Sequence, residues 1–389
     1  GFNREQAIWY HHEVADMLLL SGLAAQAQGA DFSDAYWRRL EAMLEVIASF
    51  MDVGGNLPMV GDSDDAMMLR LSHEPDFCAY RSLLATGAVL FGRPDFARKA
   101  GRLDQKSRWL LSVRPEFCDQ PRALDARFDA LLARKGGSLP VRQSFPDAGY
   151  YLLGGGVEGP EEVCVLADAG PLGYLSIAAH GHADALALWL SVRGQELLVD
   201  PGTYAYHTHK MWRDYFRGTS AHNTVRVDGE DQSVSGGNFM WLRHANARCV
   251  VWEPGQEQDR WQGEHDGYCR LNDPVVHRRE VLLNKVARKL LVRDCLECRA
   301  EHQVERFWHF AEDCQVLEQG IEVVVQKRDL MLRIRSRGTA TMSVDVVRGR
   351  EDPPLGWVSR RFDVKVPAST LVISDTITGT TMLETDITW

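Results

Sequence analysis

The chain has 389 residues and a formal net charge of -10, and 45% of its residues are hydrophobic. This length suggests two domains with ample material for a buried core, and no apolar run is long enough to cross a bilayer. The acidic balance argues against general nucleic-acid binding, which needs a basic surface, although local arginines can still bind an acidic substrate.

Helical periodicity dominates the first third of the chain. Residues 4–29 carry apolar side chains at helical spacing and end in a glycine, and residues 33–52 repeat the pattern behind a serine cap. Residues 77–92 and 122–136 continue this rhythm of helix, loop and helix, which is typical of paired antiparallel helices. We therefore predict an all-α domain over residues 1–140 and a linker near residues 136–147 that joins it to the rest of the chain.

From about residue 148 the pattern changes to short β-rich runs separated by turn signals. Such spacing is typical of an antiparallel β-sandwich. The sequence thus predicts an α+β multidomain chain whose second domain, residues 141–389, is an antiparallel β-sandwich. The clearest predicted strands lie at residues 161–169, 186–192, 196–200, 223–229, 278–285, 289–297, 321–327, 330–336 and 370–377.

Eight cysteines are scattered along the chain. Cys295 and Cys298 have C-x-x-C spacing, but the sequence contains no second such pair for a zinc ribbon. Their segment reads as a strand, in which residues three apart point to opposite faces. We therefore interpret these thiols as isolated and half-buried.

The stretch AAHGHADALALWL, residues 178–190, places His180 and His182 before an apolar run that we interpret as a strand. Alternation along a strand would put both imidazoles on one face. A hairpin with the following strand would bring Asp200 near His182, and His222 begins a further strand. Imidazole nitrogens with one carboxylate suit Zn²⁺, so a zinc site is one interpretation and ordinary surface or core histidines are the other.

Three longer segments resemble the heparinase II/III-like family of polysaccharide lyases: HGHADALALWLSVRGQELLVDPGTYAY, WRDYFRGTSAHNTVRVDGEDQ and GEHDGYCRLNDPVVHRREVL. NREQAIWYH and LPMVGDSDD resemble the helical part of that family. The resemblance implies an incomplete (α/α) toroid followed by antiparallel β-sheets. Because a toroid normally has more helices, and the chain opens on GFNREQ without an initiator Met or signal-like segment, we expect it to begin inside a longer protein.

The family cleaves acidic polysaccharides such as glycosaminoglycans or alginate by β-elimination. This chemistry needs a donor that neutralises the uronate carboxylate, a base for the C5 proton and an acid for the departing O4. The resemblance therefore implies a periplasmic or secreted lyase whose partner is an acidic polysaccharide, without nucleic acid and without a membrane span. The sequence leaves the polymer and the oligomeric state open.

The resemblance also implies roles for individual residues. His182, Asp200 and His222 match the ligands of a structural zinc ion, and His180 matches the catalytic histidine beside them. Tyr204 matches a site tyrosine that could act as acid or, with a depressed pKa, as base.

Substrate contacts are expected from both parts of the chain. Asn3 matches the asparagine that holds the substrate carboxylate, and Arg4, at a position where many members have His, can grip a carboxylate at two points. Arg213 and Arg217 are expected cationic partners of an acidic sugar, and Tyr215 a further contact.

The chain departs from the family where the helical part normally supplies a catalytic tyrosine. There it carries Asp62, Asp64 and Asp65, of which Asp62 is an expected sugar contact. This leaves open a glycoside hydrolase that uses two of these carboxylates. A carbohydrate-binding or biosynthetic protein that keeps the zinc site for stability is the third hypothesis.

Overall fold

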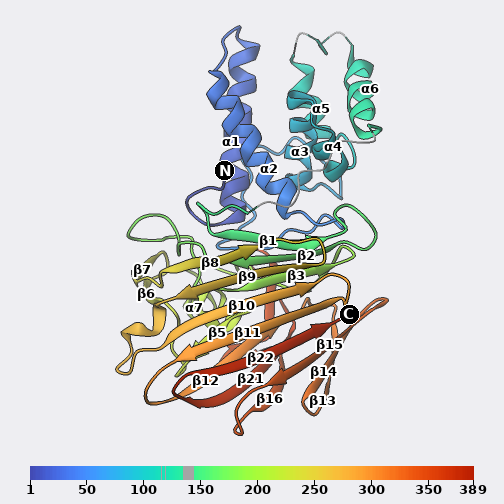
Figure 1. The fold of residues 1–389 in the computed structure, drawn as a ribbon. Coiled ribbons are helices and arrows are strands. Elements are labelled where there is room, and N and C mark those ends of the chain that lie inside the picture. The colour runs from blue at the N-terminus through green and yellow to red at the C-terminus, as the bar shows by residue number, and fades with distance from the viewer. Residues whose placement is uncertain (115, 119, 135–143) are drawn as a thin grey trace.

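Helices and sheets occupy opposite ends of the molecule in this computed structural model (Figure 1). The structure describes residues 1–114, 116–118, 120–134 and 144–389. The predicted domain boundary at residue 140 and most of the predicted linker lie outside the described residues. The helices of the described part are α1 (Ile8–Ala27), α2 (Asp34–Phe50), α3 (Ala79–Phe91), α4 (Pro94–Ala100), α5 (Gln105–Ser112), α6 (Pro121–Leu132) and α7 (Lys210–Arg217), with 3₁₀ turns η1 (Thr219–Ala221) and η2 (Gly267–Arg270).

The ends of the first helices follow from local backbone chemistry. α1 begins at Ile8 rather than at residue 4, because the amide of Gln6 donates to the carbonyl oxygen of Asn3 and Gln6 has a φ of 57°, outside the helical region. α2 begins directly after Ser33, at the predicted position, although the serine side chain makes no capping hydrogen bond. α3 ends where Gly92 adopts a left-handed φ of 65°, a common way to end a helix.

The mixed α and β character of the chain is confirmed, and α3 and α6 lie in the predicted helical segments. The sequence did not predict α4, α5 and α7, because helices of seven or eight residues are too short to show periodicity clearly. An incomplete toroid remains a prediction. Within the described part, no helix is both long enough and apolar enough to span a membrane.

Antiparallel sheets make up the second part of the chain, as predicted. One sheet has the order β1-β2-β3-β4, an eight-stranded sheet has the order β13-β14-β15-β22-β11-β10-β9-β8, and a third has the order β16-β21-β12-β5.

The first of these sheets contains β1 (Tyr150–Gly155), β2 (Val163–Asp168), β3 (Leu188–Val192) and β4 (Gln195–Leu198). The second contains β8 (Ala247–Glu253), β9 (Gln258–His265), β10 (Val276–Asn284), β11 (Lys289–Glu297), β13 (Gln315–Gln319), β14 (Glu322–Lys327), β15 (Leu330–Arg337) and β22 (Thr381–Thr388). The third contains β5 (Val225–Val227), β12 (Glu301–His309), β16 (Ser343–Arg348) and β21 (Ser369–Thr378). Three short hairpins complete the described strands: β6 (Val234–Gly237) with β7 (Met240–Arg243), β17 (Arg350–Glu351) with β18 (Pro354–Leu355), and β19 (Trp357–Arg361) with β20 (Val364–Pro367).

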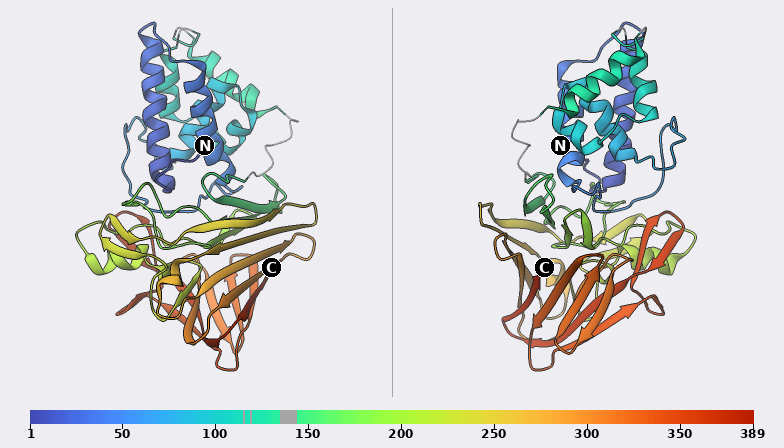
Figure 2. Two further views of the ribbon diagram at one scale, coloured as in Figure 1. Left: turned by 60° about the vertical axis from the view of Figure 1, so that its left-hand side comes forward. Right: turned by 90° about the vertical axis from the view of Figure 1, so that its right-hand side faces the viewer.

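The sheet β1–β4 is buried on both faces because it lies between the helices and the other sheets (Figures 1 and 2). Leu152 and Leu166, which are register partners, join the core of the helical part. Their neighbours Leu153 and Val165 join the core shared with the eight-stranded sheet. Both faces are apolar, which explains why these strands read as continuous hydrophobic runs rather than as alternating ones.

The eight-stranded sheet and the sheet β16-β21-β12-β5 enclose a common core. Val281 and Val292 from the larger sheet share that core with Ile373 from the smaller one. Burial alternates residue by residue along β10 and β11, as expected for strands with one face toward a core. This arrangement is the predicted face-to-face packing of antiparallel sheets.

The histidine pair does not lie on a strand, contrary to the sequence interpretation. β3 begins only at Leu188, so His180 and His182 belong to the loop that precedes it. Gly181 between them is required by a close approach, since a Cβ there would lie 1.4 Å from the carbonyl oxygen of Leu172. The apolar alternation begins before the strand because the loop itself is packed into the core, with Ala183 and Leu186 fully buried.

We expect Trp261→Ala to lower the free energy of unfolding by about 3–5 kcal/mol, the usual cost of a large cavity. The indole is fully buried and packs against Tyr151 of β1, so it couples two sheets. Urea unfolding measures the effect. Trp109, which is 60% exposed on α5, is the matched control, and Trp109→Ala is expected to change stability by less than about 0.5 kcal/mol. Equal losses in the two variants would contradict the proposed layer contact.

Candidate functional site at the junction of helices and sheets

Segments from both parts of the chain meet around Gly61. Its φ is +66°, and a Cβ at this position would lie 2.5 Å from the carbonyl oxygen of Gln6 and 2.9 Å from that of His180. Beside it, the amide of Asp62 donates to the carbonyl oxygen of His180 over 2.9 Å. A glycine therefore allows the loop after α2 to pass between the start of the chain and the histidine loop.

His180 is held by its two neighbours and still reaches solvent. Its Nδ1 lies 3.1 Å from Oδ2 of Asp62, and its ring stacks on Tyr10 with centroids 3.9 Å apart. The side chain is 18% exposed. Because Nδ1–H donates to the carboxylate, Nε2 carries the lone pair and is the nitrogen available to a substrate.

Asp62 is the buried anchor of this arrangement. Arg213 on α7 grips both carboxylate oxygens, with Nη2 2.8 Å from Oδ2 and Nη1 bonded to Oδ1. Nε2 of His182 donates to Oδ1 over 3.0 Å. Burial alone would raise the pKa of Asp62, but Arg213 and the two histidines outweigh it and hold this pKa well below its usual range. Asp62 therefore stays ionised.

Asp62 and Arg213 were expected to contact the substrate, but both are buried. The side chains of both Asp62 and Arg213 are 0% exposed, so neither is placed to touch a polymer. A sequence cannot show that a charged pair of this kind is mutually satisfied inside the protein. The pair instead positions His180 and His182.

Tyr10 and Tyr206 were not the tyrosines favoured by the sequence, yet they lie at this site. Tyr10 comes from α1 and Tyr206 from the loop after β4, and their hydroxyl oxygens are 3.0 Å apart. Both hydroxyls donate to Oδ2 of Asp64, over 3.1 and 3.0 Å. Burial, followed by the nearby carboxylates, raises the pKa of each phenol, so both remain protonated at neutral pH.

Glu13 lies one turn after Tyr10 on the same face of α1. Burial, and next the charge of Asp64, raise the pKa of Glu13 to about 7. A carboxyl group with such a pKa can hold or release a proton near neutral pH. The sequence analysis missed both Tyr10 and Glu13. Their helical spacing, in and just after the family-like NREQAIWYH segment, could have indicated that they share one face of a helix.

The structure places the other expected aromatic residues elsewhere. Tyr204 stacks on His209 and packs edge-on against Trp212, so it belongs to a neighbouring aromatic cluster. The hydroxyl of Tyr215 is buried and accepts from the amides of Gly356 and Trp357. Neither tyrosine is placed at His180.

Arg217 is also buried rather than presented to a sugar. Its guanidinium donates to the carbonyl oxygen of Asn238 over 2.6 Å and lies 4.1 Å from the ring centre of Trp241. Arg213 donates to the same carbonyl through Nε over 3.0 Å. The two arginines thus fix the turn that presents Phe239, whose ring lies against His180 and Tyr206.

A second group of histidines fits a divalent cation. Ligand atoms of His182, Asp184 and His222 all lie within 4.8 Å of one another in the buried interior. Nδ1 of His182 and Nε2 of His222 have no hydrogen-bond partner among the described residues. Since Nε2 of His182 donates to Asp62, its Nδ1 carries a lone pair. Two unpartnered imidazole lone pairs beside a carboxylate are the donor set that zinc prefers.

Asp200 was expected to be a zinc ligand, but it is not part of this group of potential ligands. Its Oδ2 accepts from Nδ1 of His222 over 3.1 Å, so it orients that ring and leaves Nε2 toward the cluster. Asp184, within the HGHAD segment, is the carboxylate that meets both histidines. Burial, and next the charge of neighbouring aspartates, raise the pKa of both Asp168 and Asp184, and a bound cation would offset this crowding of negative charge.

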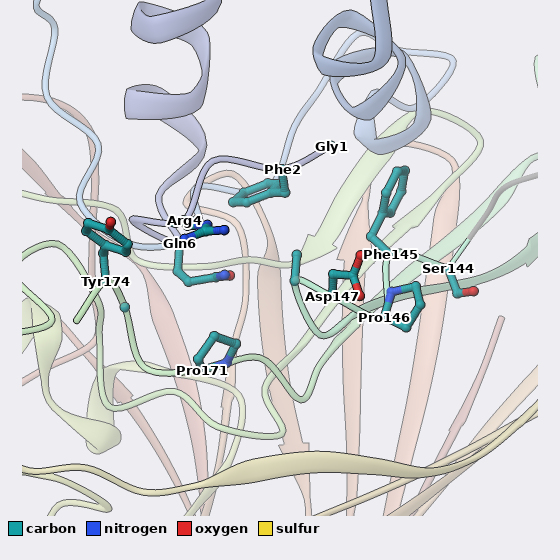
Figure 3. Close-up of a pocket in the computed structure, with 12 residues that line it drawn as sticks. Gly1, Phe2, Arg4, Gln6, Ser144, Phe145, Pro146, Asp147, Pro171 and Tyr174 are labelled. Atoms are coloured by element: carbon teal, nitrogen blue, oxygen red, sulfur yellow. The ribbon is translucent and has the colours of Figure 1, made fainter. Parts of the chain in front are cut away.

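Arg4 lines a cavity of about 770 Å³ at the start of the chain (Figure 3). Phe2, Arg4 and Gln6 line it from the start of the chain, and Pro171 lines it from the loop after β2. Oε1 of Gln6 is buried without a partner in the described part of the chain. The side-chain amide of Asn3 donates to Oε2 of Glu5 over 3.3 Å.

Comparison with known proteins agrees with this architecture. Residues 138–385 match the family model described as heparinase II/III-like, C-terminal. The chain belongs to the heparinase II/III-like family. Among curated proteins, none matches this family member.

Solved structures show how far the fold of this heparinase II/III-like chain is shared. A heparinase III superposes with a TM-score of 0.72 at 16% identity, covering 100% of this chain and 52% of its own. The heparan sulfate lyase HepC from Pedobacter heparinus gives 0.72 at 18% identity, with coverage of 100% and 52%. A further heparinase III gives 0.68 at 16%, with coverage of 100% and 54%. The chain thus spans about half the length of these proteins, and the likeness concerns the fold.

Asp62→Asn is expected to lower the free energy of unfolding by about 3–5 kcal/mol, because it leaves the buried Arg213 guanidinium without its counter-charge. Denaturant unfolding measures this change. Asp65→Asn is the control, since Asp65 is partly exposed and its nearest cation, Arg361, is 3.6 Å away. Its effect should stay within about 0.5 kcal/mol. A loss at Asp62 no larger than at Asp65 would show that the buried pair is not an anchor.

Proposed function

We propose that this protein is a polysaccharide lyase that cleaves an acidic, uronate-containing polysaccharide by β-elimination, in the periplasm or outside the cell. The observation that carries the proposal is the position of His180, which is oriented by a buried carboxylate, stacked on Tyr10 and open to solvent on one side. Membership in a family named for heparinases supports the same reaction class.

In this proposal His180 is the base. Nε2 takes the C5 proton, and Asp62 stabilises the resulting imidazolium through its hydrogen bond from Nδ1–H. Asp62 can do so because Arg213 helps to hold its pKa well below the usual range. Tyr10 supports the ring by stacking on one of its faces.

The acid comes from the pair of phenols. Tyr10 or Tyr206 donates its proton to the departing O4, and the hydroxyl contact of 3.0 Å lets the second phenol share the developing charge. Asp64 orients both hydroxyls. These residues take the place of the tyrosine that the family carries after α2.

Neutralisation of the uronate carboxylate is assigned to Arg4. Its guanidinium is exposed on the wall of the cavity, and a guanidinium binds a carboxylate at two points. Gln6 supplies an amide on the same wall, and its backbone adjoins Gly61 beside His180. A role for Asn3 in holding the carboxylate remains part of the proposal.

A structural Zn²⁺ ion is assigned to His182, Asp184 and His222, with Asp200 orienting His222. Such an ion supplies positive charge that holds the histidine loop in one conformation. His180 lies two residues from this group and therefore gains a fixed backbone position.

The geometry favours a lyase over a hydrolase that uses the aspartate cluster. A hydrolase needs two carboxyl groups that flank the glycosidic bond, one of them protonated. Asp62 is buried and ionised, and Asp64 is occupied by two tyrosines. Asp65 lies near Arg361.

Incubation with glycosaminoglycans, alginate and other uronate polymers is expected to produce the ultraviolet absorbance of an unsaturated uronate. His180→Ala should lower kcat by about 10²–10⁴-fold, the usual contribution of a positioned base. His207→Ala, an exposed histidine on a nearby loop, is the matched control and should leave kcat unchanged. Products without the double bond that carry a water-derived reducing end would indicate the hydrolase. Glycan binding without turnover in either form would indicate the binding protein.

Tyr10→Phe is expected to lower kcat by about 10²-fold or more, because it removes a phenol that supplies or relays the proton. A substrate whose O4 leaving group is an aryl alcohol needs less acid help, so the variant should regain most of its rate on it. Tyr204→Phe is the control and should match the unchanged protein on both substrates. Equal losses on both leaving groups would assign Tyr10 a packing role only.

A further inference from the structure

A second group of potential metal ligands, which includes a sulfur atom, lies outside the site described above. Ligand atoms of Asp273, Cys298 and His302 all lie within 4.8 Å of one another. Asp273 precedes β10, Cys298 follows β11 and His302 belongs to β12, so three separate segments converge. The His182 group, by contrast, contains no sulfur.

These side chains are already oriented by their neighbours. Oδ2 of Asp228 accepts from Nδ1 of His302 over 2.6 Å, which directs Nε2 toward Asp273 at 3.1 Å. The amides of Arg299 and Ala300 donate to Oδ2 of Asp273 over 2.7 and 2.8 Å and fix that carboxylate. A carboxylate behind a ligating histidine is the usual support of a metal-bound imidazole.

We propose that Asp273, Cys298 and His302 form a binding site for Zn²⁺ or a similar thiophilic divalent cation, with Asp228 as the positioning residue of His302. A thiolate, an imidazole and a carboxylate form a donor set that suits zinc. Metal binding would release the thiol proton of Cys298 and the Nε2 proton of His302 to solvent as the metal–sulfur and metal–nitrogen bonds form. His302 is buried and Cys298 is half-buried.

An imidazolium clamped between two aspartates would explain the distances around His302 without a metal. It would not involve the thiol of Cys298, whose Sγ is directed at the carbonyl oxygens of Ala300 and Gly379 over 3.4 and 3.3 Å. Cys295 is not part of the group, so the C-x-x-C spacing is not the ligand unit. The two interpretations differ in whether a metal ion binds to the sulfur of Cys298.

Cobalt titration of the full, reduced and metal-stripped chain separates these readings. Co²⁺ bound through a thiolate gives an intense near-ultraviolet charge-transfer band, and the sulfur-free His182 group cannot produce one. We expect the band in the unchanged protein and in Cys295→Ser, and its loss in Cys298→Ser. Asp228→Asn should weaken cobalt binding at this band by about 10–100-fold. Zn²⁺ should displace Co²⁺ and abolish the band.

Three results would overturn the proposal: no charge-transfer band in the unchanged protein, a band that persists in Cys298→Ser, or a band that Zn²⁺ does not displace. Far-ultraviolet circular dichroism of each variant checks that the fold is intact. If Cys298→Ser misfolds, alkylation of the native protein with and without Zn²⁺ decides the question, because a metal-bound Cys298 is protected. Equal alkylation of Cys298 in both conditions would exclude the site.

Discussion

The ion pair between Asp62 and Arg213 is the constraint on which the site depends. Asp62 follows α2 and Arg213 lies on α7, so the pair ties the helical part to the sheets. A buried carboxylate is unfavourable unless its lone pairs are used, and here His180, His182 and the hydroxyl of Thr203 also donate to it. Since few arrangements satisfy these five donors at once, the pair specifies where both histidines stand.

One carboxylate also decides how each histidine is protonated. Asp62 accepts from Nδ1 of His180 and from Nε2 of His182. The nitrogen left with a lone pair therefore faces the substrate side in His180 and the proposed metal in His182. In the proposed function, the same chemical group thus serves two different tasks at positions two residues apart.

The sequence carried most of the fold and only part of the site. Strand and helix periodicity located the main elements, because burial on one or both faces leaves a pattern in the chain. It misplaced the histidine loop, since a loop packed in the core is as apolar as a strand. It assigned Arg213 and Arg217 to the surface because their charge predicts exposure, whereas each is satisfied inside. The pairing of Tyr10 with Tyr206 was beyond its reach, because only the tertiary fold brings α1 beside a loop almost two hundred residues later.

The double burial of the sheet β1–β4 limits how this molecule can be divided. The family model begins at residue 138 and so leaves out every helix that covers the outer face of that sheet. A fragment cut there would expose Leu152, Leu166 and Trp189 as one continuous apolar surface. The segment that the family model matches is therefore not an independent structural domain here. The helices bury one face of its first sheet and cannot be removed without exposing that face.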